Sequence, residues 1–139
     1  HPTHVGVALK VIKAIRSIPK ALRPKKLYGV EIWRDLDWLN DDKKIKLDCS
    51  QHLNLERALL GLFDSQIAGG KRYDLATEGR RISNATYSES HNVDTSVRLM
   101  YAMDLTPLIE DDSLDIKEFI GGQIDDFKQS VLKNIDELG

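Results

Sequence analysis

Two histidines at the start of the sequence have a spacing that suits metal binding or proton transfer. His1 and His4 are three residues apart, and Pro2 between them suits the first turn of a helix. Because residues three apart share one face of a helix, both imidazoles can point into one cleft. A neutral imidazole can bind zinc, and a protonated one can stabilise an oxyanion or protonate a leaving amine. The alternative is a pair of solvated side chains.

Further motifs follow this pair in a fixed order, at Arg23 to Trp33, Leu47 to Ser50, Leu55 to Gln66 and Ala85 to Glu89. The succession over residues 1 to 109 resembles the carboxy-terminal half of the LmbE-like, or PIG-L, family of zinc-dependent N-deacetylases. That family has a His-Pro-Asp-His motif, a KPKxLYY-type strand, a D-x-S before a helix ending in SQ, and a Y-A-E.

The sequence departs from the family pattern at single positions and in one whole motif. Thr3 replaces the usual Asp, Leu55 stands where Lys is frequent, and Ser88 replaces Ala. The family's Ala-His-Pro-Asp-Asp motif, expected near the amino terminus, does not occur in the sequence. The chain is therefore expected to be a fragment whose missing amino-terminal segment is its partner.

The resemblance implies a zinc-dependent hydrolase that removes an N-acetyl group from an N-acetylglucosaminyl or related amino-sugar conjugate. It implies that His4 binds zinc and that His1 is the charged or acidic partner. The remaining ligands, a His and an Asp, and the carboxylate base belong to the missing motif. Residues 1–139 alone are therefore expected to be inactive.

Three further residues are candidates for contact with substrate. Tyr87 matches the Tyr of the Y-A-E motif and is predicted to donate its hydroxyl to the scissile carbonyl, and Glu89 matches its Glu. Glu31 ends the first predicted strand, where α/β folds often place site residues. The alternatives stay open: Tyr87 as a packed aromatic at a helix end, and Glu31 as a charge at the rim of a buried strand.

Hydrophobic periodicity predicts the elements that carry these residues. The predicted helices cover 3–18, 71–89 and 115–138, the last interrupted at Gly121-Gly122, and a further helix contains an apolar stripe of Leu55, Leu59, Leu62 and Phe63. That helix is predicted to be capped by Asp48 or Ser50 and to end at Ala68-Gly69-Gly70. Strands are predicted over 27–33, buried on both faces, and 97–105, with a polar surface loop over 34–46.

A helix followed by a buried strand indicates an α/β class, a Rossmann-like three-layer fold with a mostly parallel sheet, present here without its amino-terminal strands. Residues 1–112 are predicted to be the carboxy-terminal part of the deacetylase domain. Residues 113–139 are predicted to be an amphipathic helix that docks on the same domain or pairs with another subunit in a homo-oligomer.

Composition narrows the function classes. With 139 residues the chain is one domain in size, and its net charge of -2 from 20 basic and 22 acidic residues predicts no nucleic-acid or anionic-membrane partner. The single cysteine, Cys49, excludes an internal disulfide and suits a packing role. No apolar run is long enough to span a membrane, so a soluble, cytoplasmic protein is expected. The alternatives are a catalytically inactive sugar- or metal-binding module and a structural dimerisation domain.

Overall fold

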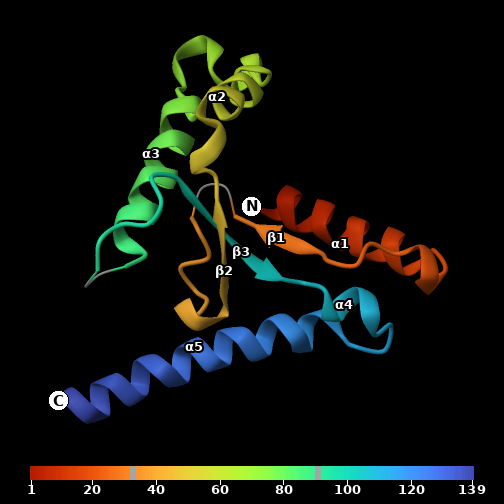
Figure 1. Cartoon of the computed structure of the whole chain (residues 1–139). Coiled ribbons are helices and arrows are strands. Elements are labelled where there is room, and N and C mark those ends of the chain that lie inside the picture. The colour runs from red at the N-terminus through yellow and green to blue at the C-terminus, as the bar shows by residue number, and fades with distance from the viewer. Residues whose placement is uncertain (32–33, 90–91) are drawn as a thin grey trace. The chain divides into compact units, whose positions relative to one another are not determined.

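The computed structural model describes residues 1–31, 34–89 and 92–139 (Figure 1). The chain forms two compact units. Unit 1 comprises His1–Gly29, Leu36–Lys44 and Met103–Gly139, and unit 2 comprises Val30–Asp35 and Ile45–Ala102. The contacts described below lie within one unit or the other.

Three strands form a small antiparallel sheet. They are β1 (Tyr28–Val30), β2 (Lys44–Asp48) and β3 (Leu99–Asp104), in the order β1-β3-β2. The Leu105 amide donates to the Leu27 carbonyl at 2.9 Å, so the start of β1 lies beside the end of β3. The Cys49 amide donates to the Arg98 carbonyl at 3.0 Å, so the end of β2 lies beside the start of β3.

The predicted Rossmann-like, mostly parallel three-layer fold is wrong. The structure is 60% helical with only this three-stranded antiparallel sheet. A parallel neighbour requires a crossover that returns the chain to the starting end of the first strand. Between β2 and β3 the chain instead passes through two helices and re-enters the sheet beside the point where it left, which reverses the strand direction.

Unit 1 contains α1 (Pro2–Arg16), α4 (Pro107–Glu110) and α5 (Ile116–Leu138), with short 3-10 turns η1 (Lys20–Leu22) and η2 (Asp41–Lys43). The predicted helices near 3–18 and 115–138 are confirmed. Pro2 occupies the first turn of α1, and the Asp115 side chain caps α5 by accepting from two backbone amides. The predicted interruption is wrong, because α5 continues through Gly121-Gly122. A glycine costs a helix only about 1 kcal/mol, which packing elsewhere on the helix can offset.

The core of unit 1 includes residues from the segment predicted to be a surface loop. Leu36, Leu39 and Met103 form its centre, and Trp38, Leu105, Phe119 and Ile120 pack against them. Leu39 is only 2% exposed, so the loop prediction for 34–46 is wrong there and also misses β2. Phe119 and Ile120 dock the first turns of α5 on its own unit, whereas Ile135 and Leu138 near its end are exposed.

Two arginines fix the segment that joins α4 to α5 against α1. The Arg16 guanidinium donates to the carbonyls of Leu108, Asp111 and Leu114 at 2.6, 3.2 and 2.8 Å. Arg23 donates to both carboxylate oxygens of Asp112 and to the Ile109 carbonyl at 2.7 Å. The bonds to the Leu108 and Ile109 carbonyls satisfy acceptors that lie within the short α4.

Unit 2 contains α2 (Leu53–Gly61) and α3 (Tyr73–Tyr87), with η3 (Ser50–His52), η4 (Asp64–Gln66) and η5 (Ala68–Gly70). The helix predicted over 71–89 is confirmed. The helix around Leu55 is also present, but it ends at Gly61 rather than at 68–70, and its N-cap is His52 rather than Asp48 or Ser50. Its predicted apolar stripe does not face a core, because Leu55, Leu59, Leu62 and Phe63 are all more than half exposed.

The strand predictions differ in outcome. The strand predicted at 97–105 is confirmed as β3, the central strand. It buries Leu99 and Met103 from the predicted apolar face but also Ala102 from the opposite face. The first strand is shorter than predicted, and its burial on both faces is wrong: Tyr28 and Val30 are 41% and 46% exposed. β1 is an edge strand of the sheet, whereas the prediction assumed neighbours on both sides. Ile32 and Trp33 of that predicted strand lie outside the described residues.

Candidate functional site

The first turn of α1 places His1 and His4 side by side, as their spacing predicts. Their ring centroids are 5.6 Å apart and the rings are tilted by 51°. His1 is the N-cap residue, and its Nδ1 accepts a hydrogen bond from the Thr3 backbone amide at 3.3 Å. An accepting Nδ1 carries no proton, so a neutral His1 in this geometry has its proton on Nε2. His4 is exposed, and its ring nitrogens bond to none of the described residues.

The histidine pair fits one ligand position of a zinc site and does not complete such a site. A catalytic zinc needs three protein ligands. Within residues 1–31, 34–89 and 92–139, no group of three or more His, Cys, Asp and Glu side chains is arranged to hold a metal ion. His4 offers an available imidazole nitrogen, whereas the cap bond occupies Nδ1 of His1.

Glu89, in unit 2, has a defined ionic partner that the sequence did not indicate. The Lys46 ammonium of β2 donates to Glu89 Oε1 at 2.8 Å and to the Ser88 carbonyl at 3.1 Å. The hydrogen bond from Lys46 is the main cause that holds the pKa of Glu89 below its ordinary value. Glu89 is thus an oriented, ionised carboxylate that can accept hydrogen bonds from hydroxyl groups.

The other two candidate substrate residues also belong to unit 2. Tyr87 is the last residue of α3 and is 78% exposed, so its hydroxyl is accessible to solvent. Glu31 directly follows β1, and its carbonyl accepts from the Asp35 amide at 3.3 Å. His1 and His4 lie in unit 1. Within unit 1 the structure places the two histidine rings side by side. Within unit 2 it pairs Glu89 with Lys46.

A buried ionic cluster in unit 2 escaped the sequence analysis. We call Glu56, Glu78, Arg81 and Arg98 the ionic cluster. The Glu56 side chain is 6% exposed and contacts Arg81 at 2.6 Å and Arg98 at 3.7 Å. Arg98 also contacts Glu78 at 2.7 Å. Glu56 is the buried residue of α2 in place of the predicted leucines, because these arginines compensate its charge.

Asp48 and Ser50 do not cap the helix as predicted; they hold the turn after β2 against the residues that precede β3. The Ser50 hydroxyl donates to the Asp48 carboxylate and accepts from the Val97 and Arg98 amides at 3.0 and 3.2 Å. The hydrogen bond from Ser50 is the main cause that lowers the pKa of Asp48. Burial raises the pKa of the Cys49 thiol, which favours its unreactive form and fits a packing role.

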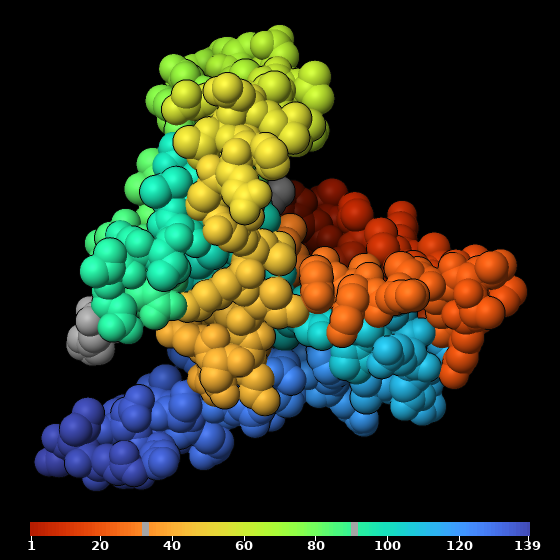
Figure 2. Space-filling view, in the orientation of Figure 1, coloured from red at the N-terminus to blue at the C-terminus, as the bar shows by residue number. Residues whose placement is uncertain are grey.

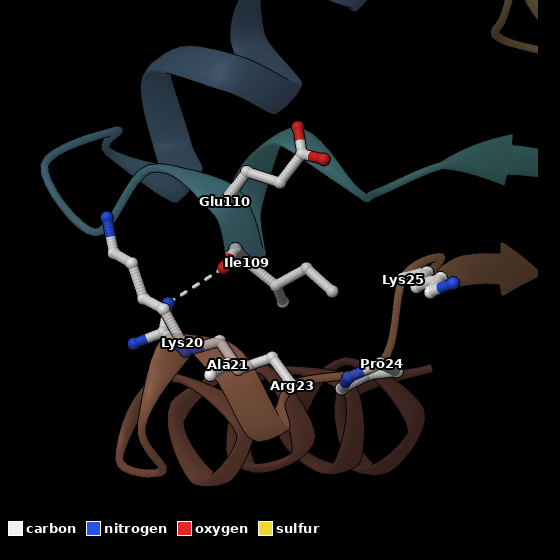
Figure 3. Close-up of a pocket in the computed structure, with 7 residues that line it drawn as sticks. All are labelled: Lys20, Ala21, Arg23, Pro24, Lys25, Ile109 and Glu110. Carbon is white, nitrogen blue, oxygen red and sulfur yellow. Dashed lines mark hydrogen bonds between the residues drawn. The ribbon is translucent and has the colours of Figure 1, made fainter.

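A hollow in unit 1 lies at the far end of α1 from the histidines (Figure 3). It is lined by Lys20, Ala21, Arg23, Pro24, Lys25, Ile109 and Glu110. Figure 3 shows Lys20 and Lys25 on opposite sides of it, and Arg23 is already bonded to the Ile109 carbonyl. The lysines do not converge on one point, so the hollow has no geometry for a single small anion.

Comparisons with known proteins add no relative. No protein-family model, curated protein or solved structure matches the chain. None of the helices in the described part of the chain is long and apolar enough to cross a membrane. The family resemblance therefore rests on the motifs of the sequence.

Proposed function

We propose that the chain forms part of a zinc-dependent N-deacetylase that hydrolyses the N-acetyl group of an N-acetylglucosaminyl or related amino-sugar conjugate. Water cleaves the amide bond to give acetate and a free amine. The observation that carries the proposal is the juxtaposition of His1 and His4 on the first turn of α1, with 5.6 Å between ring centroids. Its support is the order of the motifs that follow. The proposal does not include a Rossmann-like fold.

The two histidines have different roles in this proposal. His4 binds the zinc through a free ring nitrogen. The bound metal would polarise the scissile carbonyl and make water more acidic. The expected charged form of His1 would lose the bond from the Thr3 amide to Nδ1. In the geometry of the structure a neutral His1 keeps that bond and presents Nε2–H, which can donate a hydrogen bond to the oxyanion. The unequal surroundings of the two rings make them non-interchangeable.

The proposed substrate contacts are Tyr87 and Glu89, which match the family's Y-A-E motif, and Glu31. The Tyr87 hydroxyl is accessible and can donate to the carbonyl oxygen of the acetyl group. Glu89, held ionised by Lys46, can accept hydrogen bonds from sugar hydroxyls, and Glu31 is the second carboxylate that the proposal places among the substrate contacts. Sugar hydroxyls are donors and acceptors, so fixed carboxylates suit them.

The remaining ligands and the catalytic base come, in this proposal, from the amino-terminal segment that the resemblance implies. The outer edge of β1 would be available to a further strand, because β1 pairs on one side with β3 and is an edge of the sheet. A cytoplasmic location is part of the proposal, and the single cysteine fits such a reducing compartment.

Two alternative functions are each supported by one observation. Thr3 in place of Asp and the missing acidic motif favour a catalytically inactive sugar- or metal-binding module. Exposed Ile124, Val131, Leu132, Ile135 and Leu138 on α5 favour a structural role in which α5 pairs with a second subunit. Turnover separates the first alternative from the enzyme, and the oligomeric state of an α5 variant tests the second.

The experiment is a reconstitution. Residues 1–139 are assayed for acetate release from N-acetylglucosamine conjugates with zinc, alone and together with the separately produced amino-terminal segment. We expect turnover only from the combination, and binding of the two parts. A combination that binds the sugar without turnover would support the inactive module. Robust activity of verified residues 1–139 alone would show that the zinc site uses other residues, and the assignment would be withdrawn.

A further inference from the structure

The charges of the chain are distributed unevenly, which its net charge of -2 conceals. Residues 1–30 contain seven of the 20 basic residues and none of the 22 acidic ones. The remaining residues therefore hold thirteen basic and 22 acidic side chains. A local basic excess creates an attractive potential for anions, which is reduced here where Asp104, Glu110, Asp111 and Asp112 lie near the segment.

The most exposed part of this segment is the turn after α1. We call Ile18 to Lys26 the basic turn. Leu22 at its centre is 73% exposed and Ile18 is 39% exposed. Lys20, Lys25 and Lys26 are also exposed. Their ammonium groups donate no hydrogen bond to the described residues, although Lys20 interacts electrostatically with Asp111 and Asp112, and Lys26 with Asp104. Apolar and cationic side chains are therefore presented to solvent together.

The basic turn is held in place by Arg23, whose side chain is only 7% exposed. Arg23 bonds to the Ile109 carbonyl at 2.7 Å and to both oxygens of Asp112. In Figure 2 the turn lies on the surface at the end of the segment coloured red to orange. The bonds of Arg23 therefore fix the backbone that carries Leu22 and the lysines. A fixed backbone loses less conformational entropy when a partner binds.

The arrangement suits an extended anionic surface better than a single anion or a peptide. Lys20 and Lys25 lie on opposite sides of the hollow that Arg23 occupies (Figure 3). A small anion would need converging donors, and a peptide would need a groove. A layer of anionic headgroups over an apolar interior meets separate lysines and an apolar side chain at once, without a matched shape.

We propose that the basic turn docks the protein on an anionic lipid surface, with Leu22 inserted among the headgroups and Lys20, Lys25 and Lys26 against their phosphates and carboxylates. This departs from the expectation drawn from net charge, because attraction at a surface depends on local charge. Peripheral contact of this kind requires no membrane-spanning helix. α1 has 15 residues, about 22 Å of helix, between this turn and the histidines, so docking leaves them accessible.

The test is co-sedimentation of the protein with vesicles of phosphatidylcholine alone or with phosphatidylserine added. We expect binding only to the anionic vesicles, with loss at high salt. A Lys20→Gln/Lys25→Gln/Lys26→Gln variant should bind about 100-fold more weakly, from about fivefold for each lysine. Leu22→Ser should weaken binding about tenfold.

Two matched control variants remove the same number of lysines, or one equally exposed leucine, at positions outside the basic turn. Lys117→Gln/Lys128→Gln/Lys133→Gln on α5 and Leu62→Ser, a residue 76% exposed, should each leave vesicle binding within about twofold. Equal losses in the two triple variants would overturn the proposal, as would equal binding to both vesicle types. Binding to an acidic polypeptide such as polyglutamate without binding to anionic vesicles would also overturn it and identify an acidic protein surface as the partner.

Discussion

Replacing Glu56 by Gln should strongly destabilise unit 2. The Glu56 carboxylate forms ion pairs with Arg81, with 2.6 Å between Oε1 and Nη1, and with Arg98, with 3.7 Å between Oε2 and Nε. The Glu56 side chain is 6% exposed. The amide keeps the shape but removes the negative charge, which leaves two largely buried guanidinium groups with reduced compensation. Removing one partner of a buried ion pair costs about 3 kcal/mol or more. With a slope of about 2 kcal/mol per molar urea, the unfolding midpoint should fall by about 1.5 M.

Urea unfolding followed by far-ultraviolet circular dichroism measures this shift. Glu137→Gln is the matched control, because its carboxylate is 60% exposed and lies 3.7 Å from Lys133; its midpoint should change by no more than about 0.25 M. A double variant, Glu56→Leu with Arg81→Met, should recover part of the loss, because apolar replacement of both partners removes the uncompensated charge. Equal midpoints for Glu56→Gln and Glu137→Gln would refute the burial argument.

The remaining predictions concern the core and the candidate substrate residues. Leu39→Ala in the core of unit 1 should lower the unfolding free energy by about 2 to 4 kcal/mol in urea titrations, whereas the exposed Leu62→Ala should change it by less than about 0.5 kcal/mol. Tyr87→Phe should retain the fold and lower the proposed deacetylase turnover of the reconstituted combination about tenfold, measured as kcat; unchanged turnover would remove Tyr87 from the site. Because Lys46 lowers the pKa of Glu89, their pairing stabilises the fold above the ordinary Glu pKa and is lost as pH falls through the lowered value. Lys46→Gln should therefore have a lower unfolding free energy than wild type at about pH 7, and the difference should shrink as the pH falls through the lowered pKa of Glu89; a difference that does not shrink would contradict this.

The sequence predicts the helices and the central strand because their signals are local. The periodicity of α1 and α5 and the alternation of β3 are contained within each segment, and the i, i+3 spacing of His1 and His4 is enough to place their rings together. These features depend on backbone geometry that neighbouring residues determine among themselves.

The sheet and the ionic cluster could not be predicted in the same way. Strand direction depends on how β3 returns beside β2 after two intervening helices, and no local pattern encodes that return. Glu56 and Arg81 are 25 residues apart, so the partner that allows Glu56 to be buried is invisible in its own helix. Leu36 and Leu39 lie in a polar stretch that composition alone assigns to the surface, although the fold uses them as core.

The zinc content of the protein combined with the amino-terminal segment that we propose tests the central claim most directly. We expect about one zinc per chain by elemental analysis. His4→Ala should lose most of it, whereas His1→Ala should retain the metal and lose turnover, because the bond with the Thr3 amide occupies Nδ1 of His1 and leaves the proton of the neutral ring on Nε2. Equal zinc retention in His4→Ala and wild type would contradict the proposed site.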